Sequence, residues 1–150
     1  MANDQAQKLD ETLDFLPKFD DDGLMPAIVI EASSGTLLMQ AFVNLEALKT
    51  SLDTGYAHFW SRSRQAYWQK GETSGNRLII QDVLIDCDQD SICFMVEMEG
   101  VKAACHTGRQ SCYYRSLSLN KDALQSSEQT ISLTFNDMKP LFDPEEVYGK

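Results

Sequence analysis

The sequence lacks any apolar run that approaches the roughly 20 residues a helix needs to cross a bilayer. It is also poor in bases, with 13 Lys and Arg against 23 Asp and Glu and a formal net charge of −10. Residues 1–15, MANDQAQKLDETLDF, are too acidic and polar for a secretory signal or a transit peptide. These absences argue against membrane and nucleic-acid partners and predict a cytoplasmic protein.

Cysteine and histidine are scarce, with four Cys and two His in 150 residues. In a reducing cytosol such cysteines serve in metal binding or catalysis more often than in disulfides. Hydrophobic residues make up 43% and charged residues 24%, which is ordinary for a globular chain of single-domain length. We divide it into an acidic lead-in (1–19), a central domain (20–116) and an acidic C-terminal extension (117–150).

Strand-like runs dominate the sequence and are separated by Gly, Ser and Asn turns. Leucines at helical spacing between a capping Asn44 and a closing Gly55 predict one helix. The pattern predicts an α+β domain with a mostly antiparallel sheet and one or two helices. The expected strands are 27–32, 36–43, 56–60, 65–69, 77–86, 92–99 and both ends of 102–119.

Three aspartates alternate with a thiol and an amide in IDCDQDSIC, which spans residues 85–93. If a strand continues through Asp90, then Asp86, Asp88 and Asp90 share one face and Cys87 lies on the other. Clustered carboxylates repel one another unless a cation or solvent separates them. Their hard oxygens suit Mg²⁺, whereas a thiolate suits Zn²⁺. A solvated face or a hairpin turn over residues 88–91 is the alternative interpretation.

The segment ACHTGRQSCYYR adds Cys105, His106 and Cys112 around a glycine turn. The two cysteines lack Cys-x₂-Cys spacing, and either thiol alone is compatible with a small buried hydrophobe. Together with Cys87 they make three thiols, a number that suits an open catalytic zinc site. Cys93, within the apolar run ICFMV, is expected in the core. The sequence leaves three roles for His106: a metal ligand, a general base or a structural residue.

Basic and hydroxyl side chains gather in FWSRSRQAYWQKGETSGN, residues 59–76. Arg62 and Arg64 offer paired donors to phosphate, and the glycines allow backbone amides to approach a ligand. A Walker loop is excluded because the G-x-x-x-x-G-K spacing is absent, and two solvated turns are the alternative. Trp68 and its aromatic neighbours form either a stacking surface for a base or part of the core. The candidate substrate-binding residues are Trp60, Ser61, Arg62, Ser63, Arg64, Lys70, Glu72, Thr73, Ser74 and Gly75.

Four stretches taken together resemble the phosphoribosyl-AMP cyclohydrolase family of histidine biosynthesis: LMQAFVNLEAL, FWSRSRQAYWQKGETSGN, DCDQD and ACHTGRQSCYYR. They occur in the family's order within residues 20–116. The resemblance implies hydrolysis of the N1–C6 bond in the adenine ring of 1-(5-phosphoribosyl)-AMP. The product would be the phosphoribosyl-formimino-aminoimidazole carboxamide nucleotide. We expect the stand-alone form, because the tail is too short for the pyrophosphohydrolase domain that follows in some relatives.

The resemblance also implies the cofactors, zinc and magnesium, and an obligate homodimer that shares the zinc. In the family, zinc activates the water that attacks the ring, and His106 is our candidate for moving protons. The implied zinc ligands, drawn from both chains, are Cys87, Cys105 and Cys112. The implied magnesium ligands are Asp86, Asp88 and Asp90.

Two other functions compete with this interpretation. A zinc-dependent nucleotide deaminase would also attack a purine at C6 but would release ammonia. It is not supported, because the sequence has no H-x-E paired with P-C-x-x-C. A non-enzymatic domain, in which zinc only ties a dimer together, would instead close the coordination with Cys93 and leave no position for water.

Overall fold

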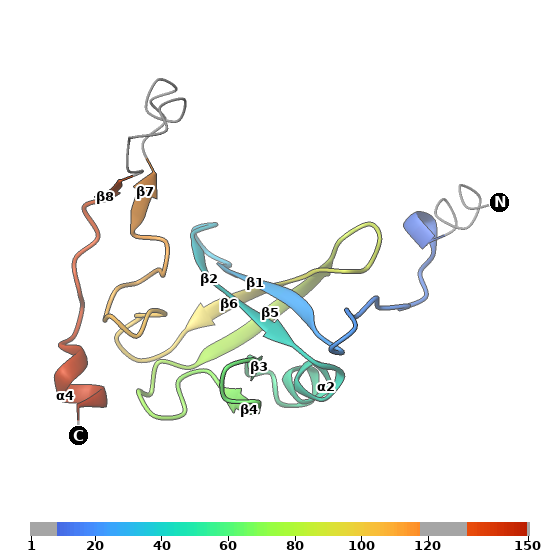
Figure 1. The fold of residues 1–150 in the computed structure, drawn as a ribbon, viewed down its shortest axis with the longest axis horizontal. Helices are drawn as coiled ribbons and strands as arrows, with labels where there is room; N and C mark the ends of the chain where they lie inside the picture. The colour runs from blue at the N-terminus through green and yellow to red at the C-terminus, as the bar shows by residue number, and fades with distance from the viewer. Residues whose placement is uncertain (1–8, 118–131, 150) are drawn as a thin grey trace.

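The computed structural model describes residues 9–117 and 132–149. One six-stranded sheet forms its body, in the order β4-β3-β2-β1-β6-β5 (Figure 1). These strands are β1 (Met25–Glu31), β2 (Leu37–Val43), β3 (His58–Ser61), β4 (Ala66–Gln69), β5 (Leu78–Ile85) and β6 (Ile92–Met98). The other elements are helix α2 (Leu45–Thr54), a ribbon of β7 (Arg115–Leu117) with β8 (Leu133–Phe135), and helix α4 (Pro144–Tyr148).

The pairing of the strands confirms the predicted α+β class with a mostly antiparallel sheet. Every paired set of neighbours is antiparallel except β1 and β6, which run parallel in register from Ala27↔Ile92 to Glu31↔Val96. A parallel pair requires a long crossover, and here the chain from β2 to β5 supplies it. No helix in the described ranges is long and apolar enough to cross a membrane.

Helix α2 begins and ends at the predicted residues. The Asn44 side chain accepts a hydrogen bond from the Ala47 amide at 2.8 Å, and Gly55 takes the left-handed conformation with φ 75°. Ala47 and Leu48 are buried. The Ser51 hydroxyl accepts from the His58 amide at 2.9 Å, so the helix is tied to the first residue of β3.

The core lies on the strands that pass through the middle of the sheet. Phe59 on β3 and Phe94 on β6 are fully buried, with ring centroids 5.9 Å apart. Leu78 is fully buried beside them in the same cluster. Cys93 is half-buried on β6, where burial raises the pKa of its thiol. The core therefore fixes the length and direction of β6.

Of the two interpretations of the aspartate segment, a strand that continues through Asp90 or a turn, the structure shows the turn. Strand β5 ends at Ile85, which pairs with Ile92, and residues 86–91 form the turn between β5 and β6. The Asp86 carboxylate accepts hydrogen bonds at 3.0 Å from the amides of Asp90 and Ser91. These bonds satisfy backbone groups that a strand would have paired with a neighbour.

The expectation of a strand over the N-terminal end of 102–119 is wrong, whereas β7 confirms a strand toward its C-terminal end. The backbone around the glycine closes on itself instead of pairing with the sheet. Cys105 N–H donates to the Arg109 carbonyl at 3.0 Å, and Gly108 N–H donates to the Cys105 carbonyl at 3.0 Å. The result is a tight loop that carries Cys105 and His106.

The acidic lead-in contacts the turn at residues 86–91. Lys18 N–H donates to the Gln89 carbonyl at 2.8 Å, and Leu16 N–H donates to the Gln89 side chain at 2.7 Å. Gln89 is 5% exposed and has a positive φ of 60°. Residues 14–18 therefore pack against the aspartate turn.

Candidate active site

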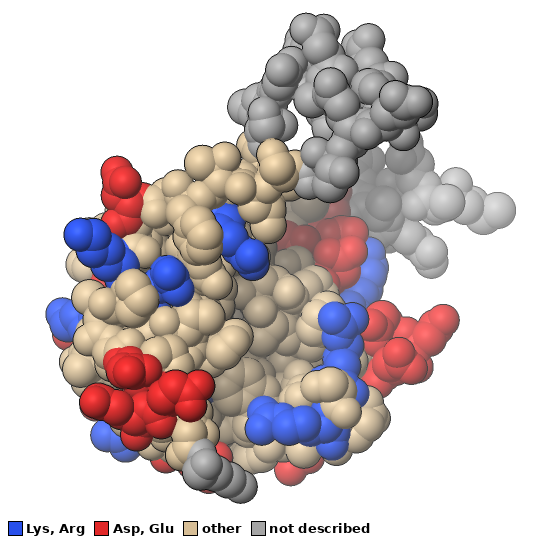
Figure 2. Space-filling view, turned by 60° about the vertical axis from the view of Figure 1, so that its left-hand side comes forward, with Lys and Arg blue, Asp and Glu red and all other residues tan. Residues whose placement is uncertain are grey.

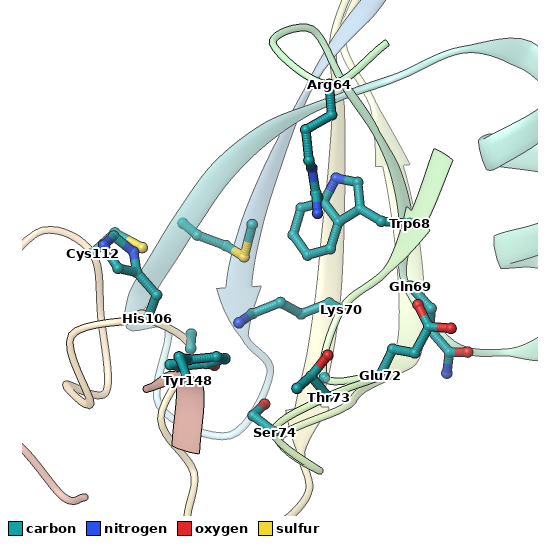
Figure 3. Close-up of a pocket in the computed structure, with 13 residues that line it drawn as sticks. Arg64, Trp68, Gln69, Lys70, Glu72, Thr73, Ser74, His106, Cys112 and Tyr148 are labelled. Carbon is teal, nitrogen blue, oxygen red and sulfur yellow. The ribbon is translucent and has the colours of Figure 1, made fainter. Parts of the chain in front are cut away.

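A cavity of about 390 Å³ opens where β4 ends, between the 71–75 loop, the 104–112 loop and α4 (Figure 3). Arg64, Trp68 and Lys70 line it from the β4 side, and His106, Cys112 and Tyr148 from the other. Figure 2 shows a hollow on one face of the molecule, with Lys and Arg side chains at several points around it and acidic side chains on more than one side. The volume falls within the usual range for small-molecule sites.

Lys70 is the charged side chain that the cavity holds in a buried position. It is only 7% exposed, and this burial lowers its pKa, while the nearby Cys112 and Cys105 act in the opposite direction. In Figure 3 its amine points across the cavity toward His106 and Tyr148. A cation in such poorly hydrated surroundings attracts an anion more strongly than an exposed lysine does.

Cys105 and Cys112 lie together on the loop beside Lys70. The Cys112 thiol and the Thr107 hydroxyl, whose oxygen lies 3.1 Å from the Cys105 sulfur, both donate hydrogen bonds to that sulfur. These bonds outweigh burial and lower the pKa of Cys105 to about 5. The pKa of Cys112 is raised, first because its thiol donates this hydrogen bond to Cys105 and second because its surroundings desolvate it. The pair therefore offers one ready thiolate, a donor that suits a soft cation.

Asp86, Asp88 and Asp90 each place a carboxylate oxygen within 4.8 Å of the other two. The three residues lie in the 86–91 turn, which brings their carboxylates together. The charge of Asp88, followed by desolvation and Asp86, raises the pKa of Asp90, while Lys18 opposes it. Three converging carboxylates fit a hard divalent cation such as Mg²⁺.

Cys87 lies apart from the other two predicted zinc ligands. It follows β5 in the aspartate turn, whereas Cys105 and Cys112 follow the opposite end of β6, whose seven residues extend about 20 Å. The only His, Cys, Asp and Glu group of three or more within metal-binding distance, among the described residues, is the aspartate cluster. Within one chain, Cys105 and Cys112 therefore lie together, whereas Cys87 lies at the other end of β6.

Seven of the ten predicted substrate-binding residues line one of two cavities, whereas Ser61, Ser63 and Gly75 line neither. Arg64, Lys70, Glu72, Thr73 and Ser74 line the first cavity.

Trp60 and Arg62 instead line a second cavity of about 230 Å³. Arg62 stacks its guanidinium 4.0 Å from the centroid of the Phe42 ring. The Ser61 hydroxyl lies 3.4 Å from that of Ser63 and accepts from the backbone of Arg64. The two serines therefore brace the turn that orients Arg64.

Sequence reasoning missed Tyr148, which contributes to the cavity wall from α4. It lies 36 positions after Cys112 in a segment assigned to the extension, and no spacing links it to the other motifs. Only the packing of the chain brings it to the site.

Comparison with known proteins matches this chain to one family. The family profile described as "Phosphoribosyl-AMP cyclohydrolase" matches residues 39–114. A protein of that name from Rhizobium leguminosarum bv. trifolii (strain WSM2304) is 45% identical over 148 residues, which cover 99% of this chain and 94% of that protein. The chain belongs to this family. The resemblance read from the motifs is thereby confirmed.

Other relatives carry the same name. The protein from Chelativorans sp. (strain BNC1) is 51% identical over 109 residues, 73% of this chain and 78% of that protein. The protein from Mesorhizobium japonicum (strain LMG 29417) is 45% identical over 142 residues, 95% of this chain and 88% of that protein. The cyclohydrolase family profile includes the 86–90 turn and the 104–112 loop, whereas α4 follows its last matched residue.

Gly71 and Gly75 test whether close approach between backbone segments shapes the 71–75 loop of the cavity wall. Both have positive φ, 82° at Gly71 and 76° at Gly75, but a Cβ at Gly71 would collide with the backbone of residues 76 and 77, whereas Gly75 has open space. Gly75→Ala should lower the free energy of unfolding by about 1 kcal/mol through its left-handed backbone alone. Gly71→Ala should cost clearly more in urea denaturation. Equal losses would show that close backbone approach does not shape the loop.

Proposed function

We propose that this protein is a phosphoribosyl-AMP cyclohydrolase. It hydrolyses the N1–C6 bond of 1-(5-phosphoribosyl)-AMP and yields the phosphoribosyl-formimino-aminoimidazole carboxamide nucleotide for L-histidine biosynthesis in the cytoplasm. The observation that carries the proposal is the first cavity, in which phosphate-binding chemistry adjoins His106 and a thiol pair. Membership in the cyclohydrolase family supports it.

The β4 side of the cavity has the chemistry to bind the substrate's phosphates. Arg64 presents a planar donor pair, and buried Lys70 presents a compact cation. Thr73 and Ser74 add hydroxyl donors on the adjoining loop. We assign phosphate binding to these residues and give Arg62 a supporting role, because its guanidinium lies over Phe42 and lines the other cavity.

The donor sets fit the two metals that the cyclohydrolase family implies. Cys105 and Cys112 would hold zinc, and the lowered pKa of Cys105 favours the thiolate form that binds metals. Asp86, Asp88 and Asp90 would hold magnesium through oxygen. A bound zinc ion supplies Lewis-acid chemistry that lowers the pKa of water.

The position of Cys87 supports a homodimer. Because Cys87 and the Cys105–Cys112 pair lie at opposite ends of β6, one chain cannot bring all three thiols to one ion without rearranging its core. We propose that Cys87 of a second copy completes each zinc site. In a two-fold dimer the arrangement repeats, so both sites are complete.

His106 is the side chain to which we assign proton transfer. It lies on the cavity wall next to Cys105 and opposite the phosphate-binding side. A neutral imidazole takes a proton from the attacking water and returns it to N1 as the bond to C6 breaks.

The reaction is tested directly by supplying phosphoribosyl-AMP to the full chain loaded with zinc and magnesium. We expect the ring-opened product to accumulate, followed by absorbance, with no release of ammonia, because water cleaves a ring bond rather than displacing the exocyclic amine. An ammonia assay on the same samples separates this activity from deamination. Absence of turnover in fully metallated protein rejects the proposed function.

Replacing His106 separates proton transfer from metal binding. His106→Ala should retain its zinc, measured by metal analysis, while kcat falls by about 10²- to 10⁴-fold because general acid–base catalysis is lost. An unchanged kcat would remove His106 from the reaction. Loss of zinc would make it a ligand instead.

Mixing two inactive variants tests whether the zinc site is shared. Cys87→Ser and Cys105→Ser should each be inactive alone, because every site in either homodimer lacks one ligand. After subunit exchange, half of the dimers carry one intact site, so about a quarter of wild-type activity should return. Cys105→Ser mixed with Cys112→Ser is the control: both changes fall in the part of the site that one chain supplies, so no dimer has an intact site and no activity should return. If Cys87→Ser and Cys105→Ser restore no activity, the three ligands are not divided between chains.

A further inference from the structure

The C-terminal segment, residues 138–148, returns to the loop that carries Cys105, His106 and Cys112 (Figure 1). Leu141 N–H donates to the Gly108 carbonyl at 2.7 Å. The Arg109 side chain donates to the Met138 carbonyl at 3.1 Å, and Ser111 N–H lies 3.3 Å from the Met138 sulfur. The segment is thus bonded at several points to the loop that bears the reactive side chains.

Gly108 shows how close this contact is. A Cβ at that position would collide with the carbonyl oxygen of Phe142, so the two backbones touch where only glycine leaves room. Gly108, the glycine of the CHTG motif, therefore has two roles. It allows the turn, through its φ of 80°, and it leaves room for the C-terminal segment.

The local sequence of α4 fixes the direction of Tyr148. The Asp143 carboxylate caps the helix by accepting from the Glu145 amide at 3.0 Å, and Pro144 follows it in the first turn. The Phe142 and Tyr148 rings pack with centroids 6.1 Å apart. These contacts turn the Tyr148 ring into the cavity wall.

The charges around the cavity determine which part of a nucleotide meets this wall. Among the described residues, Arg64 and Lys70 are the bases that line the cavity, and both come from the β4 side. Phosphates are therefore attracted to this first side, and the rest of the nucleotide extends toward the second side, where α4 lies. In Figure 3 Tyr148 lies beside His106 on the second side, where the reacting ring must sit.

We propose that Tyr148 is a positioning residue whose ring packs against the purine of the substrate, and that the 138–148 segment is a wall of the active site. The inference rests on the proposed function. Flat aromatic surfaces stack on any nucleobase, and Trp68 supplies an aromatic surface on the other side of the cavity. The segment therefore contributes to substrate affinity from outside the part of the chain that the family profile matches.

Steady-state kinetics with phosphoribosyl-AMP on the metal-loaded full chain test this role. Tyr148→Ala should raise KM about tenfold through loss of stacking and change kcat little, because the ring positions substrate without joining the chemistry. Tyr148→Phe keeps the ring and should retain the wild-type KM. Glu146→Ala, an exposed residue of the same helix, is the matched control and should also retain it.

The outcomes separate this inference from the proposed function. If the wild-type chain shows no turnover, the proposed function fails. If it is active but Tyr148→Ala keeps its KM, or Tyr148→Phe is impaired as strongly as Tyr148→Ala, the positioning role alone is overturned. Should Tyr148→Ala lower the Tm, Tyr148→Leu keeps apolar packing against Phe142 without the flat ring, and the same KM criterion applies to it.

Discussion

The length of β6 is the constraint on which the arrangement of the site depends. Its apolar residues are buried between β1 and β5, so the strand stays extended and separates its two ends by about 20 Å. The aspartate turn with Cys87 lies at one end, and the loop with Cys105 and Cys112 follows the other. One thiol is thus kept apart from the other two within one chain, which is why the proposed zinc site requires a second copy.

Burial and hydrogen bonding each lower the pKa of one of two neighbouring reactive groups. Burial lowers the pKa of Lys70, whereas donated hydrogen bonds lower the pKa of Cys105 to about 5 despite its burial. A weakly hydrated cation therefore lies beside a sulfur that favours its anionic form. Both groups are held by backbone contacts, Lys70 through its amide to Ala57 and Cys105 through the Arg109 carbonyl. The fold thus maintains the electrostatics of the cavity.

Both segments outside the centre of the chain contact the proposed metal loops. The lead-in binds Gln89 in the aspartate turn, and residues 138–148 bind Gly108 and Arg109 in the thiol loop. We separated these segments from the central domain at residues 19 and 116 because of their acidic composition. Composition does not predict contacts between segments. Parts that are acidic and polar in sequence thereby become supports for the two loops.

The sequence by itself determined the class of fold, the α2 helix with Asn44 and Gly55 at its ends, and the family. Those features depend on local periodicity, capping chemistry and motif order. The tertiary structure decided for a turn over residues 86–91, which the sequence left open between a strand and a turn, and there the Asp86 carboxylate accepts hydrogen bonds from the amides of Asp90 and Ser91. It also placed Arg62 and Arg64 in different cavities and brought Tyr148 to the wall. Such positions arise from contacts between residues far apart in the chain, and no local spacing encodes them.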